Sequence, residues 1–133
     1  MSADHATYVD SSALVKLAVH EAESAALRRY LERRRPLVSS ALARTEVVRA
    51  LLPLGSEAVR RGKEVLARVE LLRVNDRVLD AAGLVAPSDL RSLDAIHLAS
   101  AEQLGTDLRS FVTYDERLAS AAAGRGWQVV QPA

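Results

Sequence analysis

The chain contains no cysteine. This absence excludes a disulfide scaffold, thiolate metal sites and a cysteine nucleophile. Aromatic residues make up only 4% of the sequence, which disfavours a base-stacking platform for single-stranded nucleic acid. No apolar run approaches the roughly 18 residues of a membrane span, and the N-terminal sequence MSADHATYVD lacks the basic and apolar regions of a signal peptide. We therefore expect no membrane partner and a cytoplasmic location.

Several common catalytic motifs are also missing. Neither a Walker A sequence nor G-x-G-x-x-G occurs, so a glycine loop that cradles phosphates is excluded. G-x-S-x-G is absent, and Ser11 and Ser12 have no positioned base, so a serine hydrolase is not indicated. Lys+Arg and Asp+Glu number 18 and 17, a net charge of +1 that by itself predicts no partner.

The residues that are present fit one globular domain. The chain has 133 residues, 49% of them hydrophobic, with no repeat or linker, and we expect a single domain over residues 1–133. Short apolar runs alternate with stretches of helical periodicity, which predicts an α/β fold with a parallel sheet. The expected strands are 6–9, 37–38, 71–74, 111–113 and 127–130, and the expected helices are 11–17, 21–34, 41–52, 56–69, 76–85, 93–104 and 116–123.

Four carboxylates stand out against this pattern. Asp10 and Asp115 follow expected strands, where ligands bind in open parallel sheets. Glu46 and Asp94 lie in largely apolar helical stretches, and a carboxylate is rarely buried unless it is paired or binds a metal. Gathered together, the four would repel one another, whereas a hard cation such as Mg²⁺ or Mn²⁺ removes that cost.

Each acid also has a simpler interpretation. Asp10 and Asp115 are suited to cap the helices that follow them, and Asp94 in a first helical turn is favourable with the helix dipole. Glu46 is suited to pair with Arg49 or another nearby arginine. His97, three residues after Asp94, is either a partner or base at an acidic site or, more simply, a half-buried packing residue.

The densest basic segment is 28–35, with the sequence RRYLERRR. As a helix end it complements the helix dipole and forms a solvated face. The same segment also fits a surface that contacts nucleic-acid phosphates through charge.

Four segments together resemble the motifs of PIN-domain proteins. VDSSALVKL at 9–17 resembles the opening motif, and SSALARTE at 39–46 the glutamate-bearing helix. LRSLDAIHLASA at 90–101 and VTYDERL at 112–118 resemble the third and fourth motifs. The order and intervals match over nearly the whole chain, and the length is similar to that of VapC-like toxins of type II toxin–antitoxin systems.

The resemblance implies a PIN-like three-layer sandwich, with a central parallel sheet of four to five short strands flanked by helices. It implies a Mg²⁺-dependent endoribonuclease, with Mn²⁺ able to substitute. In that family Asp10, Glu46, Asp94 and Asp115 would form the catalytic metal site, with Ser12 and Thr113 supporting it.

The partners implied are RNA such as tRNA or rRNA, a cognate VapB-like antitoxin and a second copy of the chain. The alternative is a catalytically silent PIN-fold module that binds RNA or protein.

Overall fold

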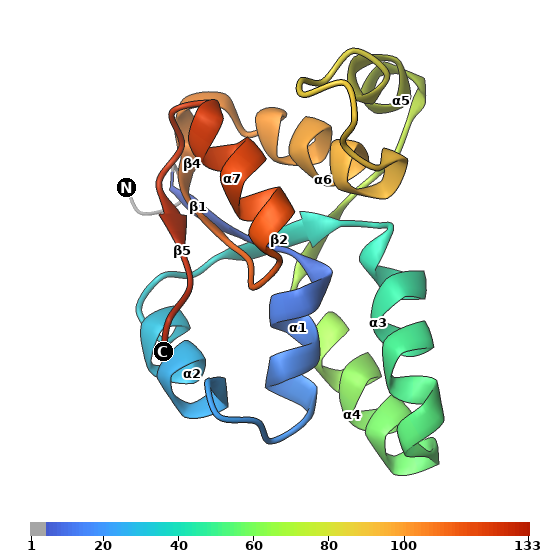
Figure 1. Cartoon of the computed structure of the whole chain (residues 1–133). Helices are drawn as coiled ribbons and strands as arrows, with labels where there is room; N and C mark the ends of the chain where they lie inside the picture. The colour runs from blue at the N-terminus through green and yellow to red at the C-terminus, as the bar shows by residue number, and fades with distance from the viewer. Residues whose placement is uncertain (1–4) are drawn as a thin grey trace.

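The computed structural model describes residues 5–133 (Figure 1). The first four residues, part of the segment from which we expect no signal peptide, lie outside the described residues. The elements in chain order are β1 (Ala6–Val9), α1 (Ser11–Ala18), α2 (Ser24–Leu31), β2 (Leu37–Ser40), α3 (Ala43–Leu51), the 3₁₀ turn η2 (Leu52–Leu54), α4 (Ser56–Leu66), β3 (Glu70–Leu72), α5 (Asp76–Ala82), α6 (Ser92–Glu102), η3 (Gly105–Asp107), β4 (Leu108–Val112), α7 (Glu116–Gly124) and β5 (Val129–Val130).

Within residues 5–133 the strands form one five-stranded sheet in the order β3-β2-β1-β4-β5, and each neighbouring pair is parallel. The predicted α/β class with four to five short strands is therefore confirmed. The central strand β1 and its neighbour β4 lead toward Asp10 and Asp115. Because the strands are parallel, both acids reach the carboxyl edge of the sheet.

Helices cover both faces of the sheet and make three layers (Figure 1). Helices α1 to α4 lie on one face, α6 and α7 lie on the other, and α5 packs against α6. Alternation along β1 sends Val9 to the first side and Tyr8 to the second. The first core includes Val9, Leu14, Leu27, Val47, Leu51 and Val112. The second includes Tyr8, Val38, Leu98, Phe111 and Leu118.

Several predicted boundaries were wrong for local reasons. The helix expected over 21–34 begins only at Ser24, whose hydroxyl accepts from the Glu21 N–H at 2.9 Å and closes a turn before the helix. The helix expected from residue 41 begins at Ala43, because the Ala41 N–H donates to the Leu72 carbonyl at 2.8 Å, beside the β2–β3 pairing. No helix among residues 5–133 is long and apolar enough to cross a membrane.

Candidate active site

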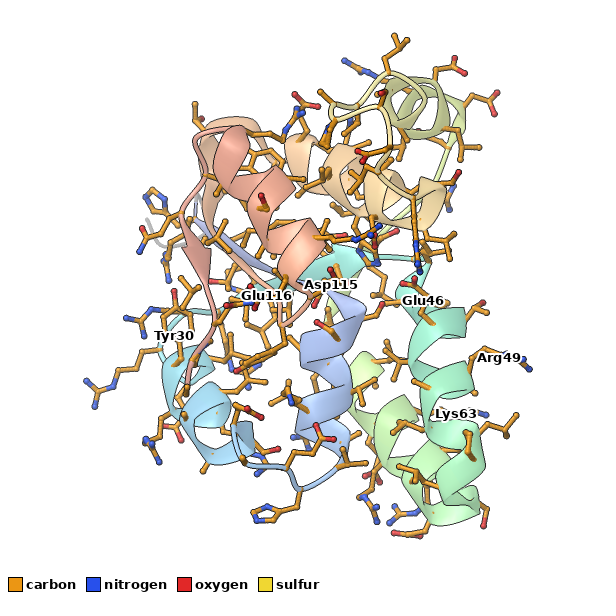
Figure 2. The ribbon with its side chains drawn as sticks, viewed as in Figure 1. Tyr30, Glu46, Arg49, Lys63, Asp115 and Glu116 are labelled. Atoms are coloured by element: carbon orange, nitrogen blue, oxygen red, sulfur yellow. The ribbon has the colours of Figure 1, made fainter. Side chains whose placement is uncertain are left out.

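The four predicted acids come from four places at the carboxyl edge of the sheet. Asp10 follows β1, Glu46 lies in the first turn of α3, Asp94 in the first turn of α6, and Asp115 directly precedes α7. Figure 2 shows Asp115 just above the start of α1, and Glu46 beside it at the start of α3. The fold thus brings one carboxylate from each motif to the same edge.

Asp10 is buried, with 3% of its surface exposed, and both of its carboxylate oxygens accept hydrogen bonds. Oδ1 accepts from the Ser12 hydroxyl at 2.7 Å and from the Ala13 N–H at 3.0 Å. Oδ2 accepts from the Thr113 hydroxyl at 2.6 Å. Asp10 is therefore both the N-cap of α1 and a carboxylate held in one orientation.

Ser12 and Thr113 tie the ends of β1 and β4 together. The Ser12 hydroxyl accepts from the Tyr114 N–H at 2.9 Å, and the Thr113 hydroxyl accepts from the Asp115 N–H at 3.0 Å. Each hydroxyl therefore orients Asp10 while satisfying a backbone donor of the loop that leads to α7. The structure places both predicted supporting residues beside the acids.

Glu46 is held by two side chains on other elements. Its Oε1 accepts from the Ser11 hydroxyl at 2.6 Å and lies 2.6 Å from Nε2 of His97. Arg49, one turn further along α3, points outward and away from Glu46 in Figure 2. The interpretation of Glu46 as an arginine partner on the surface is therefore not the arrangement found; Glu46 turns toward the sheet edge.

Asp94 and Asp115 are less constrained. Asp94 is half-buried, and within residues 5–133 no hydrogen bond reaches its carboxylate. Asp115 is exposed and caps α7, because its Oδ1 accepts from the Leu118 N–H at 3.0 Å. The capping interpretation of Asp115 thus holds together with its place among the acids.

The pKa values of three of these carboxylates are shifted, in different directions and for different reasons. Burial raises the pKa of Asp10, against the hydrogen bonds from Thr113 and Ser12. Burial also raises the pKa of Asp94, and the negative charges of Asp115 and Glu46 raise it further. For Glu46 burial opposes ionisation, but hydrogen bonds from His97 and Ser11 hold the pKa of its carboxyl below the ordinary value. Of these carboxylates it is Asp94 whose ionisation the neighbouring negative charges disfavour.

The donor chemistry fits a hard divalent cation, because these side chains supply carboxylate oxygens that repel one another when no ion is bound. Within residues 5–133 no group of three or more acidic or histidine side chains is already close enough to hold a metal ion. The structure therefore presents the ligand types at one edge without a completed coordination shell.

Two contacts and the burial of one side chain at this site went beyond the sequence prediction. Ser11, dismissed as a nucleophile, holds Glu46, and the buried Tyr8 hydroxyl lies 2.8 Å from Nδ1 of His97. His97 itself is 2% exposed and more deeply enclosed than expected. The available signal was Tyr8 itself, because a tyrosine inside an apolar strand needs a partner for its hydroxyl.

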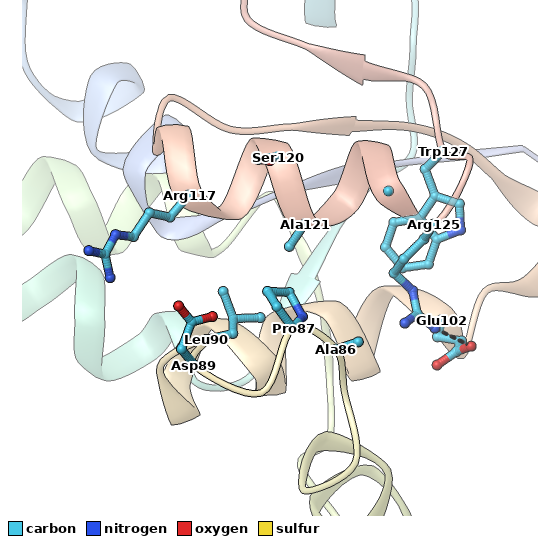
Figure 3. A pocket seen from close by; sticks show the side chains of 11 residues that line it. Ala86, Pro87, Asp89, Leu90, Glu102, Arg117, Ser120, Ala121, Arg125 and Trp127 are labelled. Carbon is cyan, nitrogen blue, oxygen red and sulfur yellow. Dashed lines mark ion pairs between the residues drawn. The ribbon is translucent and has the colours of Figure 1, made fainter.

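A cavity of about 880 Å³ lies away from these acids, between α7 and the loop before α6. Figure 3 shows Arg117 and Asp89 at one end and Arg125, paired with Glu102, at the other. The four acids do not line this cavity. The candidate site is therefore an open edge of the sheet rather than this pocket.

Comparison with known proteins gives a consistent result. The family model described as PIN domain matches residues 7–124. Ribonuclease VapC46 of Mycobacterium tuberculosis is 58% identical over 127 residues, which cover 96% of this chain and 98% of the relative. Ribonuclease VapC35 of the same organism is 40% identical over 94% of this chain and 96% of its own length.

Solved structures show the same fold. The Mycobacterium tuberculosis toxin VapC20, described as cleaving the sarcin–ricin loop, superposes with a TM-score of 0.76 at 18% identity, covering 95% of this chain and 99% of that one. A toxin–antitoxin complex from Klebsiella pneumoniae gives 0.71 at 20% identity, covering 96% and 98%. With a family model matching most of its length and VapC ribonucleases as relatives, the chain belongs to the PIN-domain family.

Proposed function

We propose that this chain is a metal-dependent endoribonuclease, the toxin of a type II toxin–antitoxin pair, formed by a single PIN-like domain over residues 1–133. The observation that carries the proposal is the placement of four carboxylates at the carboxyl edge of the sheet, each from a different motif. The names of its relatives, ribonucleases VapC46 and VapC35, support the same chemistry.

Asp10, Glu46, Asp94 and Asp115 are the proposed catalytic residues and would hold Mg²⁺, for which Mn²⁺ can substitute. When bound, the ion supplies Lewis acidity that activates water and neutralises charge on the phosphodiester. Because no complete coordination shell is present in residues 5–133, we expect binding to draw the less constrained Asp94 and Asp115 toward the other two acids.

The chain's own residues perform two tasks in this scheme. Ser12 and Thr113 hold both oxygens of Asp10 in place, so that this carboxylate needs no reorganisation when a ligand arrives. Ser11 and His97 do the same for Glu46 from one side. The exposed position of Asp115 leaves the edge open to a large substrate such as RNA.

RNA requires a positive surface, and the end of α2 offers one. Arg28, Arg29, Arg33 and Arg35 are exposed, and Arg34 lies over the Tyr30 ring at 4.0 Å. We propose that exposed arginines of this segment contact RNA phosphates through charge, without reading base sequence.

A VapB-like antitoxin and a second copy of this chain complete the proposed assembly, and its place is the cytoplasm. An arginine on the antitoxin would suit the acidic edge, because its planar fork pairs with carboxylates bidentately. Coexpression of the cognate antitoxin should relieve growth inhibition, and a version without its arginine should relieve it less.

The test is cleavage of RNA by the purified chain with Mg²⁺, with EDTA, and with Mn²⁺ added back. We expect cleavage that EDTA abolishes and Mn²⁺ restores, and we expect Asp10→Asn to remove it. Asp80→Asn is the matched control, since Asp80 is exposed on α5 and outside the acidic site. RNA binding without cleavage in every condition would instead support the catalytically silent binding module.

A further inference from the structure

A run of polar contacts leads from the core of the sheet to Glu46. The Tyr8 hydroxyl lies 2.8 Å from Nδ1 of His97, and Nε2 of His97 lies 2.6 Å from Oε1 of Glu46. Tyr8 is fully buried, and His97 is 2% exposed. Both ring nitrogens of His97 therefore have protein partners, and the ring is shielded from solvent.

The partners determine which atoms donate. An ionised carboxylate only accepts hydrogen bonds, so Nε2 of His97 must carry the proton that faces Glu46. In the neutral ring Nδ1 is then an acceptor, and the Tyr8 hydroxyl donates to it. The tyrosine thus selects the tautomer in which His97 can donate to the carboxylate.

Packing leaves Tyr8 little freedom. Its ring stacks on Phe111 at 5.0 Å between centroids with an interplanar angle of 9°. The same ring meets His97 edge-on at 5.9 Å and 82°. The aromatic core on the α6–α7 side of the sheet therefore fixes the Tyr8 ring, and the ring fixes the position of its hydroxyl.

Both contacts to Glu46 fall on one oxygen. Oε1 faces Ser11 and His97, and within residues 5–133 no hydrogen bond reaches Oε2. A carboxylate anchored through one oxygen presents the other in a defined direction. Partners of this kind, which orient a ligand without touching the ion, tune metal affinity in many proteins.

We propose that His97 and Tyr8 are positioning residues that hold Glu46 by Oε1 and present Oε2 to the metal ion. This inference rests on the proposed function, because it assumes that Glu46 is a metal ligand. It assigns His97 no role as a base, since both of its nitrogens are engaged in the core.

The test is calorimetric titration of Mn²⁺ into the full chain without RNA, with the melting temperature of each metal-free variant recorded beside it. His97→Leu removes the donor, His97→Gln keeps an N–H near the position of Nε2, and Tyr8→Phe removes only a hydroxyl. Tyr30→Phe is the matched control, because the Tyr30 hydroxyl also donates to a side chain, Ser110, at 3.1 Å.

We expect His97→Leu to weaken Mn²⁺ binding by about 10- to 100-fold and His97→Gln to recover most of that loss. Tyr8→Phe should weaken binding by about fivefold, the loss of one hydrogen bond, and Tyr30→Phe should leave it unchanged. If His97→Leu fails to fold, Tyr8→Phe and His97→Gln still decide the matter.

Wild-type affinity in Tyr8→Phe, or in a folded His97→Leu, would overturn the positioning role while leaving the metal site intact. Equal losses in His97→Leu and in a folded His97→Gln would also overturn it. A wild-type chain that binds no Mn²⁺ would instead overturn the proposed metal-dependent function.

Discussion

The two halves of the candidate site differ in how firmly their carboxylates are held. Asp10 accepts three hydrogen bonds, and Glu46 is anchored between Ser11 and His97. Asp115 accepts one cap hydrogen bond from its own helix, and within residues 5–133 Asp94 accepts none. The site thus has a fixed half, Asp10 and Glu46, and an adjustable half, Asp94 and Asp115.

This difference shows how one small fold tolerates four like charges without an ion. Hydrogen bonds keep the fixed acids oriented and offset part of the cost of burial, which still raises the pKa of Asp10. The repulsion falls on the adjustable half, where the pKa of Asp94 is raised by burial and by the charges of Asp115 and Glu46. Preorganised ligands on one side and adjustable ones on the other are suited to an ion that binds and leaves.

The largest expected effect comes from removing an acid of the fixed half. Asp10→Asn should lower RNA cleavage by more than about 100-fold, beyond the usual cost of losing a residue that merely orients a ligand. Asp115→Asn should lower it by only about 10-fold, because asparagine still caps α7 and the remaining acids can adjust. Initial cleavage rates of both variants at saturating Mg²⁺ measure the contrast. Equal losses would remove the distinction between the halves.

A smaller effect is expected in the metal-free stability of Glu46→Gln. The low pKa of Glu46 means that its ionised form stabilises the fold above the unfolded-state pKa, and this contribution is lost as pH falls through the folded-state pKa. Replacing the charge should lower the melting temperature at pH 7 by about 3 °C, a loss near 1 kcal/mol. Melting curves at pH 7 and pH 4 check this, since the deficit should shrink at the lower pH.

The smallest expected effect is an increase in the metal-free melting temperature, opposite in sign to the decrease expected for Glu46→Gln. Because the pKa of Asp94 is raised in the folded state, ionisation of Asp94 destabilises the metal-free fold as pH rises through that pKa. Asp94→Asn should therefore raise the metal-free melting temperature at pH 7 by about 2 °C, a small shift because the side chain is only half-buried. The gain should fade toward pH 4, where wild-type Asp94 takes up its proton. A decrease at pH 7 would show that Asp94 is held more firmly than its contacts suggest.

Much of the fold was predictable because its signals are local. Asp10, Asn75 and Asp115 each follow a strand or extended segment, and each caps a helix in the structure. The strand order was not predictable in the same way, because β1 pairs with both β2 and the distant β4. That pairing depends on how the helices pack on each face.

The candidate site shows the same contrast between local signals, which the sequence reveals, and long-range contacts, which it does not. The four acids could be selected from their places after strands or in apolar helices and from the motifs around them. The contact between Tyr8 and His97 joins residues 89 positions apart, and it depends on which face of α6 packs over the sheet. Periodicity places His97 on the face of Asp94, but it cannot say that the ring is buried between Tyr8 and Glu46.

The most direct measurement is a crystal structure of the chain with Mn²⁺, located by its anomalous scattering. The account predicts an ion beside Asp10 and Oε2 of Glu46, with both side chains oriented as they are here and with Asp94 and Asp115 moved toward the ion. An ion bound away from these four acids would contradict the proposed site. A Glu46 that leaves His97 while Asp94 and Asp115 keep their positions would contradict the division into fixed and adjustable halves.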